Sequence, residues 1–201
     1  MRYGMVIDLK RCVGCNSCAV ACLAEKGTPL GIHYQRVLKY EVGKYPMARM
    51  QFRPILCMHC QEPACLKVCP TGATYQRDDG IVLVDHNKCI GCRYCVLACP
   101  YEARQFLKRI DNYFGPGTTT PYEMIKQKDL DKGTAVKCDF CVVRLEKGRV
   151  PACVETCPAQ ARYFGNLDDP ESEVAKLIAL NRGTVLKEEL GTRPSVYYIN
   201  G

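Results

Sequence analysis

The stretch that decides the fold is Cys12-Val13-Gly14-Cys15-Asn16-Ser17-Cys18-Ala19-Val20-Ala21-Cys22, in which four cysteines have the spacing C-x2-C-x2-C-x3-C. Outward along the chain, the same spacing returns, with a proline after the last cysteine, at Cys89, Cys92, Cys95 and Cys99. A third group has the spacing C-x2-C-x4-C-x3-C-P and consists of Cys57, Cys60, Cys65 and Cys69. A fourth has the spacing C-x2-C-x11-C-x3-C-P and consists of Cys138, Cys141, Cys153 and Cys157. The 16 cysteines therefore form four groups of four, with none left over.

Three kinds of chemistry compete for these cysteines. Disulfides suit an oxidising compartment, but cysteines two residues apart rarely reach one another without strain. Zinc ribbons use paired C-x2-C knuckles and do not require the succession C-x2-C-x2-C. That succession, followed by Cys-Pro, is the signature of bacterial ferredoxins, in which three thiolates hold one [4Fe–4S] cube and the fourth reaches another cube. Two strict and two stretched copies favour iron–sulfur clusters, with zinc and disulfides left as alternatives.

Composition and charge agree with this interpretation. Of the 201 residues, 47% are apolar and 24% are charged, which excludes collagen-like, low-complexity and largely disordered chains. The formal charge of +7 counts the cysteines as neutral. Four oxidised cubes with their thiolates add about −8, so the basic excess balances the cofactors and implies no nucleic-acid partner. No apolar run reaches the roughly 18 to 20 residues of a membrane span, and we expect neither a direct span nor an export signal.

Short repeats surround the cysteines. Residues 7–15 match residues 84–92: in both, a short apolar strand ends at Asp before the cysteine loop. Gly14 and Gly91 stand where this loop must curl tightly, a place for positive φ or close backbone approach. A second repeat, C-P-x-x-A, begins at Cys69, Cys99 and Cys157. Its proline turns the chain away from a cluster, and its alanine is small enough to pack against one.

The remaining elements are expected to be short. Asp79-Gly80 predicts a hairpin between the strands 74–76 and 81–84. A helix is predicted to run to about residue 181 and to stop at Gly183. Its N-cap would be Asp169, its first helical residue Pro170, and the acidic residue of its first turn Glu171. We further expect a strand at 33–41, helices at 19–24 and 96–99, an insertion at 110–137 with irregular Gly115-Pro116-Gly117 and Thr118 to Pro121, and an extended piece at 195–199. The apolar core would be thin, because aromatic residues are 8% of the chain and Trp is absent. We therefore expect a largely unfolded apo-protein.

The four groups in this order resemble the four-cluster electron-transfer subunit of the molybdopterin oxidoreductases of the dimethyl sulfoxide reductase type. The likeness covers nearly the whole chain and is greatest to the polysulfide/thiosulfate and respiratory arsenate reductase branch. The segments most like that branch are Met5-Val6-Ile7-Asp8, Arg144-Leu145-Glu146-Lys147-Gly148, Pro151-Ala152-Cys153-Val154-Glu155-Thr156-Cys157-Pro158 and Gly165-Asn166-Leu167-Asp168-Asp169-Pro170. Nitrate reductase partners in this family often carry Trp and a [3Fe–4S] cluster at the position of Cys92, so the cysteine here implies four [4Fe–4S] clusters.

The resemblance also implies which cysteines share a cube. Set 1 would be Cys12, Cys15, Cys18 and Cys157; set 2 would be Cys22, Cys138, Cys141 and Cys153. Set 3 would be Cys57, Cys60, Cys65 and Cys99; set 4 would be Cys69, Cys89, Cys92 and Cys95. The expected fold is α+β, with two pseudo-twofold ferredoxin-like modules, each holding two clusters. Module A would comprise residues 1–30 and 136–165, and module B residues 54–107, with a hairpin connection at 31–53, an inserted loop at 108–135 and a C-terminal helix and extended docking tail at 166–201.

A chain of clusters conducts single electrons, and nothing in the sequence supplies a catalytic site. His33, His59 and His86 are too few and too scattered for a triad; His59 either tunes its cluster or, more often at such a place, simply packs, and His86 is expected to be solvated. The resemblance implies a catalytic partner holding a Mo or W bis-guanine dinucleotide cofactor, a quinone-reactive membrane partner, and a place on the periplasmic face by co-export, with the cytoplasm left open. The alternatives are an iron–sulfur subunit of a hydrogenase or formate dehydrogenase, and a free polyferredoxin carrier.

Overall fold

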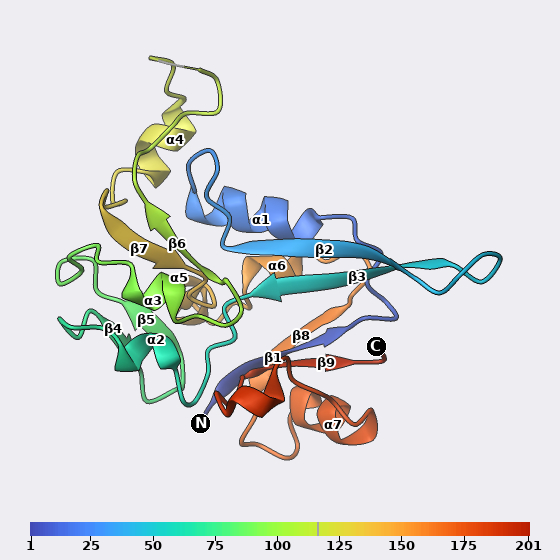
Figure 1. The fold of residues 1–201 in the computed structure, drawn as a ribbon. Coiled ribbons are helices and arrows are strands. Elements are labelled where there is room, and N and C mark those ends of the chain that lie inside the picture. Colours follow the sequence, from blue (N-terminus) through green and yellow to red (C-terminus); the bar gives the residue numbers. More distant parts are fainter. Residues whose placement is uncertain (116) are drawn as a thin grey trace.

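One sheet joins the two ends of the chain in this computed structural model, which describes residues 1–115 and 117–201 (Figure 1). Its strands are β1 (Tyr3–Asp8), β8 (Arg162–Asn166) and β9 (Val196–Ile199), in the order β8-β1-β9. β8 is antiparallel to β1, with Tyr3 opposite Asn166, and β9 is parallel to it, with Met5 opposite Val196. β1 is buried from Gly4 onward because it is the middle strand, which explains its run of apolar residues.

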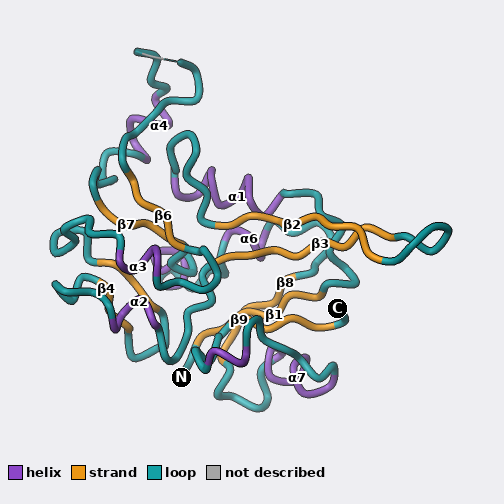
Figure 2. Tube along the Cα trace, viewed as in Figure 1, coloured by secondary structure: helices purple, strands orange, loops and turns teal. Residues whose placement is uncertain are grey.

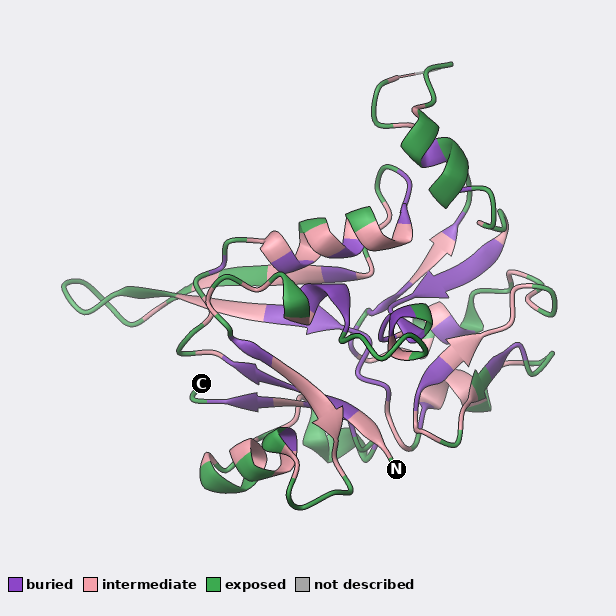
Figure 3. Cartoon of the chain, turned by 180° about the vertical axis from the view of Figure 1, so that it is seen from behind, coloured by how far each residue is buried: buried purple, intermediate pink, exposed green. Residues whose placement is uncertain are grey.

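A long hairpin arm leaves the body of the molecule. β2 (Gln35–Val42) pairs with β3 (Arg49–Leu56) in antiparallel register from Gln35 opposite Leu56 to Val42 opposite Arg49. Burial falls along the arm: its base is buried against the body, and its tip is exposed, with Tyr45 at 95% exposure (Figure 3). Apolar side chains at the base thus anchor an otherwise solvated hairpin.

The cysteines lie on short helices, which are purple in Figure 2, and on the loops that precede or follow them. These helices are α1 (Ser17–Lys26), α2 (Ala64–Lys67), α3 (Tyr94–Leu97), α5 (Val142–Leu145) and α6 (Ala152–Glu155). α1 contacts α6, and α2 contacts α3, so helices from different cysteine groups meet in pairs. Two small two-stranded sheets complete this part, the hairpin of β4 (Thr74–Gln76) with β5 (Val82–Val84) and the pair of β6 (Arg104–Leu107) with β7 (Thr134–Lys137).

The remaining helices are peripheral. α4 (Pro121–Lys126) begins with a capping box in which the Thr120 side chain accepts from the backbone N–H of Glu123, and the Glu123 carboxylate accepts from that of Thr120. α7 (Glu173–Leu180) packs on β8, β1 and β9, and a 3-10 turn spans Glu188–Leu190. None of the helices in residues 1–115 and 117–201 has the length and apolar character needed to cross a bilayer.

The apolar core is continuous between the terminal sheet and the cysteine loops. Met5 and Ile7 of β1, Leu56 and Met58 at the end of the arm, and Phe140 between two cysteines belong to one buried cluster. Several cysteines are themselves members of this cluster. The core therefore surrounds the cysteines rather than standing apart from them.

Most of the elements expected from the sequence are present, with three corrections. The hairpin across Asp79-Gly80, the strand at β2, the helices at α1 and α3 and the extended piece at β9 are confirmed. The C-terminal helix begins at Glu173 instead of Pro170, because Ser172 is the N-cap and accepts from the N–H of Ala175, while Asp169 caps only the preceding turn.

The expected insertion is less irregular than its glycines and prolines suggested. Pro121 starts α4 as its first helical residue, and β7, at the end of the expected insertion, is a buried strand paired with β6. Within the segment 115–117, Pro116 lies outside the described residues. His86 is the third correction: it is partly buried and its Nδ1 lies 2.9 Å from the Thr134 hydroxyl.

Candidate iron–sulfur cluster sites

The four cysteine groups share one backbone feature. In each, the residue just before the second cysteine has a positive φ: Gly14 (66°), His59 (41°), Gly91 (70°) and Phe140 (52°). At the first of the two glycines, a Cβ atom would stand 2.2 Å from the Phe52 ring, and at Gly91 it would stand 2.2 Å from the carbonyl oxygen of Gly133. The expectation of a tight curl at both glycines is confirmed, and glycine is required there by contact as well as by conformation.

The cysteines of set 1 line a single cavity. Cys12, Cys15, Cys18 and Cys157 surround it together with apolar and small residues. Two donors from the protein already point at sulfur: the N–H of Ala161 lies 3.3 Å from Cys157 Sγ, and Arg162 Nη2 lies 3.2 Å from Cys18 Sγ. Residues 12–18 and 157 are brought together because β1 and β8 pair and deliver both loops to the same end of the sheet.

The cysteines of set 2 line a second cavity. Cys22, Cys138, Cys141 and Cys153 surround it, and all four are buried. Contact between α1 and α6 brings Cys22 and Cys153 close to one another. Lys26 and Asp139, which also line this cavity, form an ion pair with an N–O distance of 2.7 Å. Burial raises the pKa of Cys22, as do Cys153 and Cys141 beside it, and burial raises that of Cys141 to about 11.

The cysteines of set 3 are also close together. Burial raises the pKa of Cys60 to about 12, and Cys57, Cys65 and Cys99 contribute to the rise. For set 4, Cys69 follows α2, Cys89 and Cys92 lie in the loop before α3, and Cys95 is on α3. Backbone N–H groups approach two of these sulfurs, from Thr74 to Cys69 at 3.4 Å and from Ala135 to Cys89 at 3.5 Å.

The donor chemistry fits an iron–sulfur cube. Crowded, buried thiols with raised pKa values stay protonated when no metal is bound. Iron removes their protons when it binds them, and its positive charge offsets the cost of burying the thiolates. In the described part of the chain, no group of three His, Cys, Asp or Glu side chains is close enough to hold a single metal ion. Thiolates that each bind a different corner of a cube stand farther apart than ligands of one ion, and backbone N–H groups directed at sulfur are a usual feature around such clusters.

Contacts also connect the cysteine sets to one another. The rings of His59 and Phe140, one from set 3's loop and one from set 2's, stack with centroids 3.8 Å apart. The thiolate of Cys57 contributes to the raised pKa of Cys138, whose largest cause is burial. Two of the 16 cysteines, all of which are described, are exposed: Cys15 in set 1 and Cys92 in set 4. Sets 1 and 4 are therefore the ones that approach the surface most closely.

The three histidines lie apart, as the sequence suggested. His33 is exposed, and His59 is fully buried, with its Nδ1 accepting from the N–H of Val82 at 3.1 Å. Burial and the nearby cations Lys137 and Arg104 hold the pKa of His59 well below 6.5, so the ring is neutral. The His59 ring therefore packs against a specific partner, the Phe140 ring.

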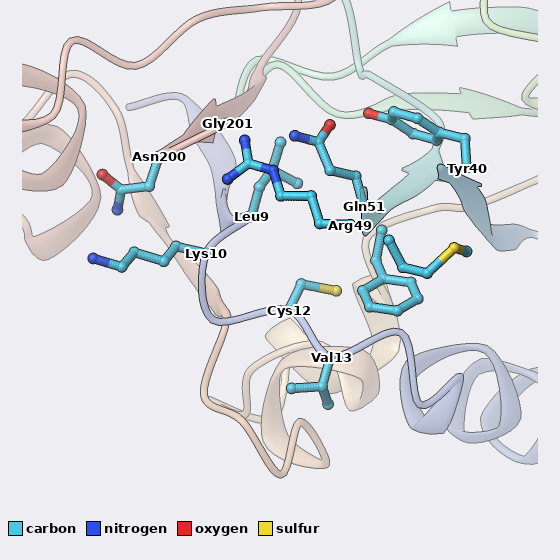
Figure 4. Close-up of a pocket in the computed structure, with 11 residues that line it drawn as sticks. Leu9, Lys10, Cys12, Val13, Tyr40, Arg49, Gln51, Asn200 and Gly201 are labelled. Carbon is cyan, nitrogen blue, oxygen red and sulfur yellow. The ribbon is translucent and has the colours of Figure 1, made fainter. Parts of the chain in front are cut away.

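Sequence reasoning missed two buried arginines beside the cysteines and a surface hollow. Arg104 and Arg162 are 3% and 5% exposed and lie among the cysteines, although each directly follows a C-P-x-x-A repeat that could have revealed it. The hollow, of about 480 Å³, borders Cys12 and is rimmed by Lys10 and Arg49 (Figure 4). It brings solvent close to set 1 without any group of catalytic residues.

The chain is similar to known iron–sulfur proteins. Residues 7–73, and residues 48–113 with 117–167, match the 4Fe–4S dicluster domain. The chain is 49% identical to a selenate reductase subunit of Mesobacillus selenatarsenatis, over 99% of this chain and 72% of that protein. It is 39% identical to the arsenate respiratory reductase iron-sulfur subunit of a Shewanella species (99% and 96%) and 44% identical to a tetrathionate reductase subunit of Salmonella typhimurium (98% and 72%).

These likenesses extend along nearly the entire chain and include both dicluster regions. With 16 cysteines in two dicluster domains, the protein carries four [4Fe–4S] clusters and has no catalytic site of its own. The chain belongs to the 4Fe–4S dicluster family, among the iron–sulfur electron-transfer subunits of the molybdopterin oxidoreductases.

Proposed function

We propose that this chain conducts single electrons along a fixed series of clusters, set 1 to set 2 to set 3 to set 4, inside an anaerobic respiratory reductase complex. The observation that carries the proposal is the order of the contacts. Arg162 lies among cysteines of sets 1 and 2, the His59–Phe140 stack joins sets 2 and 3, and Arg104 lies among cysteines of sets 3 and 4.

Exposure of the cysteines supports the same order. The four cysteines of set 2 are buried and none of set 3 is exposed, while sets 1 and 4 each contain one exposed cysteine, Cys15 and Cys92. A conductor needs clusters that are shielded from solvent in its middle and accessible at its ends. Burial in the middle also tunes the potential of a cluster, since the protein controls it by solvent exposure, charge and hydrogen bonds to sulfur.

The proposal includes the assignment of ligands. The sixteen cysteines would bind iron in the four sets defined above, so that module A (residues 1–30 and 136–165) holds sets 1 and 2, and module B (residues 54–107) holds sets 3 and 4. Shared cavities support sets 1 and 2, and mutual effects on pKa support set 3. A pseudo-twofold relation within each module is supported by the recurrence of positive φ before the second cysteine.

The partners follow from the relatives. A selenate, an arsenate and a tetrathionate reductase each contain a relative of this chain, so we propose a molybdenum- or tungsten-containing catalytic subunit at one end of the series. A quinone-reactive membrane subunit would stand at the other end, with the complex on the periplasmic face by co-export. The hairpin arm, the segment 108–135 and the tail after residue 165 offer exposed apolar side chains for docking, among them Tyr45, Met47, Met124 and Ile125.

Metal analysis of the native complex, isolated anaerobically, tests the proposal. Molybdenum or tungsten together with about sixteen irons per copy of this chain is the expected result. The same iron without a heavy partner metal would instead indicate a free carrier, and nickel would indicate a hydrogenase. Zinc in place of iron would overturn the cluster assignment itself.

A further inference from the structure

Two arginines occupy the same place in a repeated motif. Cys99-Pro-Tyr-Glu-Ala103 is followed by Arg104, and Cys157-Pro-Ala-Gln-Ala161 is followed by Arg162. Each arginine is the first residue of a strand, β6 or β8, and each is almost fully buried. A buried guanidinium is costly unless anionic partners compensate it, so the surroundings of both residues bear on function.

Arg162 lies between the two cysteine sets of module A. Its Nη2 lies 3.2 Å from Cys18 Sγ of set 1, and its Nη1 lies 3.7 Å from the sulfur of Met5. Burial alone would lower the pKa of Arg162, but thiolates at Cys153 of set 2 and at Cys18 and Cys157 of set 1 raise it. None of the ion pairs among the described residues involves Arg162. Its anionic surroundings are therefore the cysteines of both sets.

Arg104 has the equivalent environment in module B. Its Nη1 donates to the hydroxyl of Thr74 at 3.0 Å, and Thr74 itself follows the C-P-x-x-A repeat that begins at Cys69. Burial opposes its charge, whereas thiolates at Cys65 and Cys57 of set 3 and at Cys95 of set 4 favour it. Its Nε and Nη2 are buried without a protein hydrogen-bond partner in the described residues. Both nitrogens can therefore donate to a cluster that the cysteines hold.

We propose that Arg162 and Arg104 are shared redox-tuning cations, each raising the reduction potentials of both clusters in its own module. The inference rests on the ligand sets proposed above. Reduction adds one negative charge to a cluster, and a fixed, buried positive charge beside it stabilises the reduced form more than the oxidised form. Because each guanidinium lies between two sets, one residue acts on two clusters, and neither arginine acts on the other module.

The test is a redox titration of the intact complex by electron paramagnetic resonance. In Arg162→Gln, two of the four midpoint potentials should fall by at least about 59 mV, which corresponds to a tenfold change in a one-electron equilibrium. In Arg104→Gln, the other two should fall. Arg11→Gln and Arg93→Gln are matched controls, because these arginines are exposed although each is next to a cysteine, and solvent screens their charge.

The lysine variants separate charge from structure. Arg162→Lys and Arg104→Lys keep the charge and should keep all four potentials within about threefold in equilibrium constant of the wild type. If a glutamine variant fails to assemble, its lysine counterpart and the remaining glutamine variant still decide the matter. Unchanged potentials in Arg104→Gln or Arg162→Gln would overturn the proposal, as would the same pair shifting in both variants, or lysine shifting them as much as glutamine. The iron content of the wild-type complex tests the proposed function separately, since it does not depend on either arginine.

Discussion

Replacing Phe140 with alanine should loosen the junction between the cluster loops. The Phe140 side chain is 1% exposed, stacks on His59 at a centroid distance of 3.8 Å and meets Phe164 edge-on at 5.2 Å. Removing a buried phenylalanine costs about 3–5 kcal/mol, since the cavity it leaves is only partly filled by relaxation. The loss of the two aromatic contacts, each about 0.5–1.5 kcal/mol, is contained in that range.

The cost is best measured as a rate. Unfolding of a protein with tightly bound cofactors is not a simple two-state equilibrium, so the rate at which the clusters lose their visible absorbance in anaerobic urea is the suitable quantity. If half of the cost appears in the barrier to unfolding, about 1.5–2.5 kcal/mol, then Phe140→Ala loses its clusters about 10 to 70 times faster than the wild type.

Phe114→Ala is the matched control, because that ring is 68% exposed and its removal should leave the rate unchanged. A double-mutant cycle with His59→Ala checks the stack itself and should give a coupling of about 0.5–1.5 kcal/mol. Equal rates of cluster loss in Phe140→Ala and the wild type would refute the reasoning that this ring holds the two loops together.

The other predictions concern single features. Cys92→Ser should perturb one cluster, with conversion to a [3Fe–4S] form, and should slow electron transfer without abolishing partner docking; loss of two or more cluster signals in a folded complex would contradict the assignment to set 4. Removing the clusters anaerobically should leave a largely unfolded chain by circular dichroism, since metal-binding free energy is folding free energy in such proteins, and a native-like apo spectrum would speak against this. Thr120→Ala should weaken α4 by about 0.5–2 kcal/mol and increase cleavage by proteases near residue 120. Backbone hydrogen bonds from Thr120 and Tyr113 lower the pKa of Glu123 below 4.5, so this carboxylate stabilises the segment above pH 4.5 and that contribution is lost as the pH falls through the lowered pKa; hydrogen exchange of the segment checks the direction.

Cysteine spacing predicted the chemistry of this molecule because iron–sulfur ligation imposes a local constraint on sequence. Three ligands within seven residues, with Gly14 or Gly91 between the first two, must curl around a cube, and such a constraint is visible without any knowledge of the fold. Periodicity and turn residues likewise predicted the hairpin across Asp79-Gly80, which depends on neighbours in sequence alone. The helix at α7 was misplaced by three residues, since Asp169 and Ser172 are both suitable caps and only tertiary packing selects between them.

Features that depend on distant contacts were not predictable in this way. His59 and Phe140 occupy the position that is glycine in the other two groups, and only the folded chain shows that their rings stack on each other. Arg104 and Arg162 look like ordinary surface cations in the sequence, and their burial follows from strand pairing with residues far away along the chain. Arginine follows two of the three C-P-x-x-A repeats, and that recurrence would have singled out Arg104 and Arg162, although it would not have revealed what surrounds them.

The joining of both chain ends in one sheet has a consequence for biosynthesis. Met5 of β1 contacts Arg162, 157 residues later in the sequence, and β1 acquires its other neighbour only with residues 196–199. At about 5–20 residues per second, the ribosome needs roughly 8 to 30 s to make the intervening chain. Throughout that interval the buried strand β1 and the cysteines Cys12, Cys15 and Cys18 of the proposed set 1 remain without their partners. With the ligand sets proposed above, a complete cluster at this end of the protein forms only late in translation or after it, and the nascent chain needs protection from oxygen and aggregation until then.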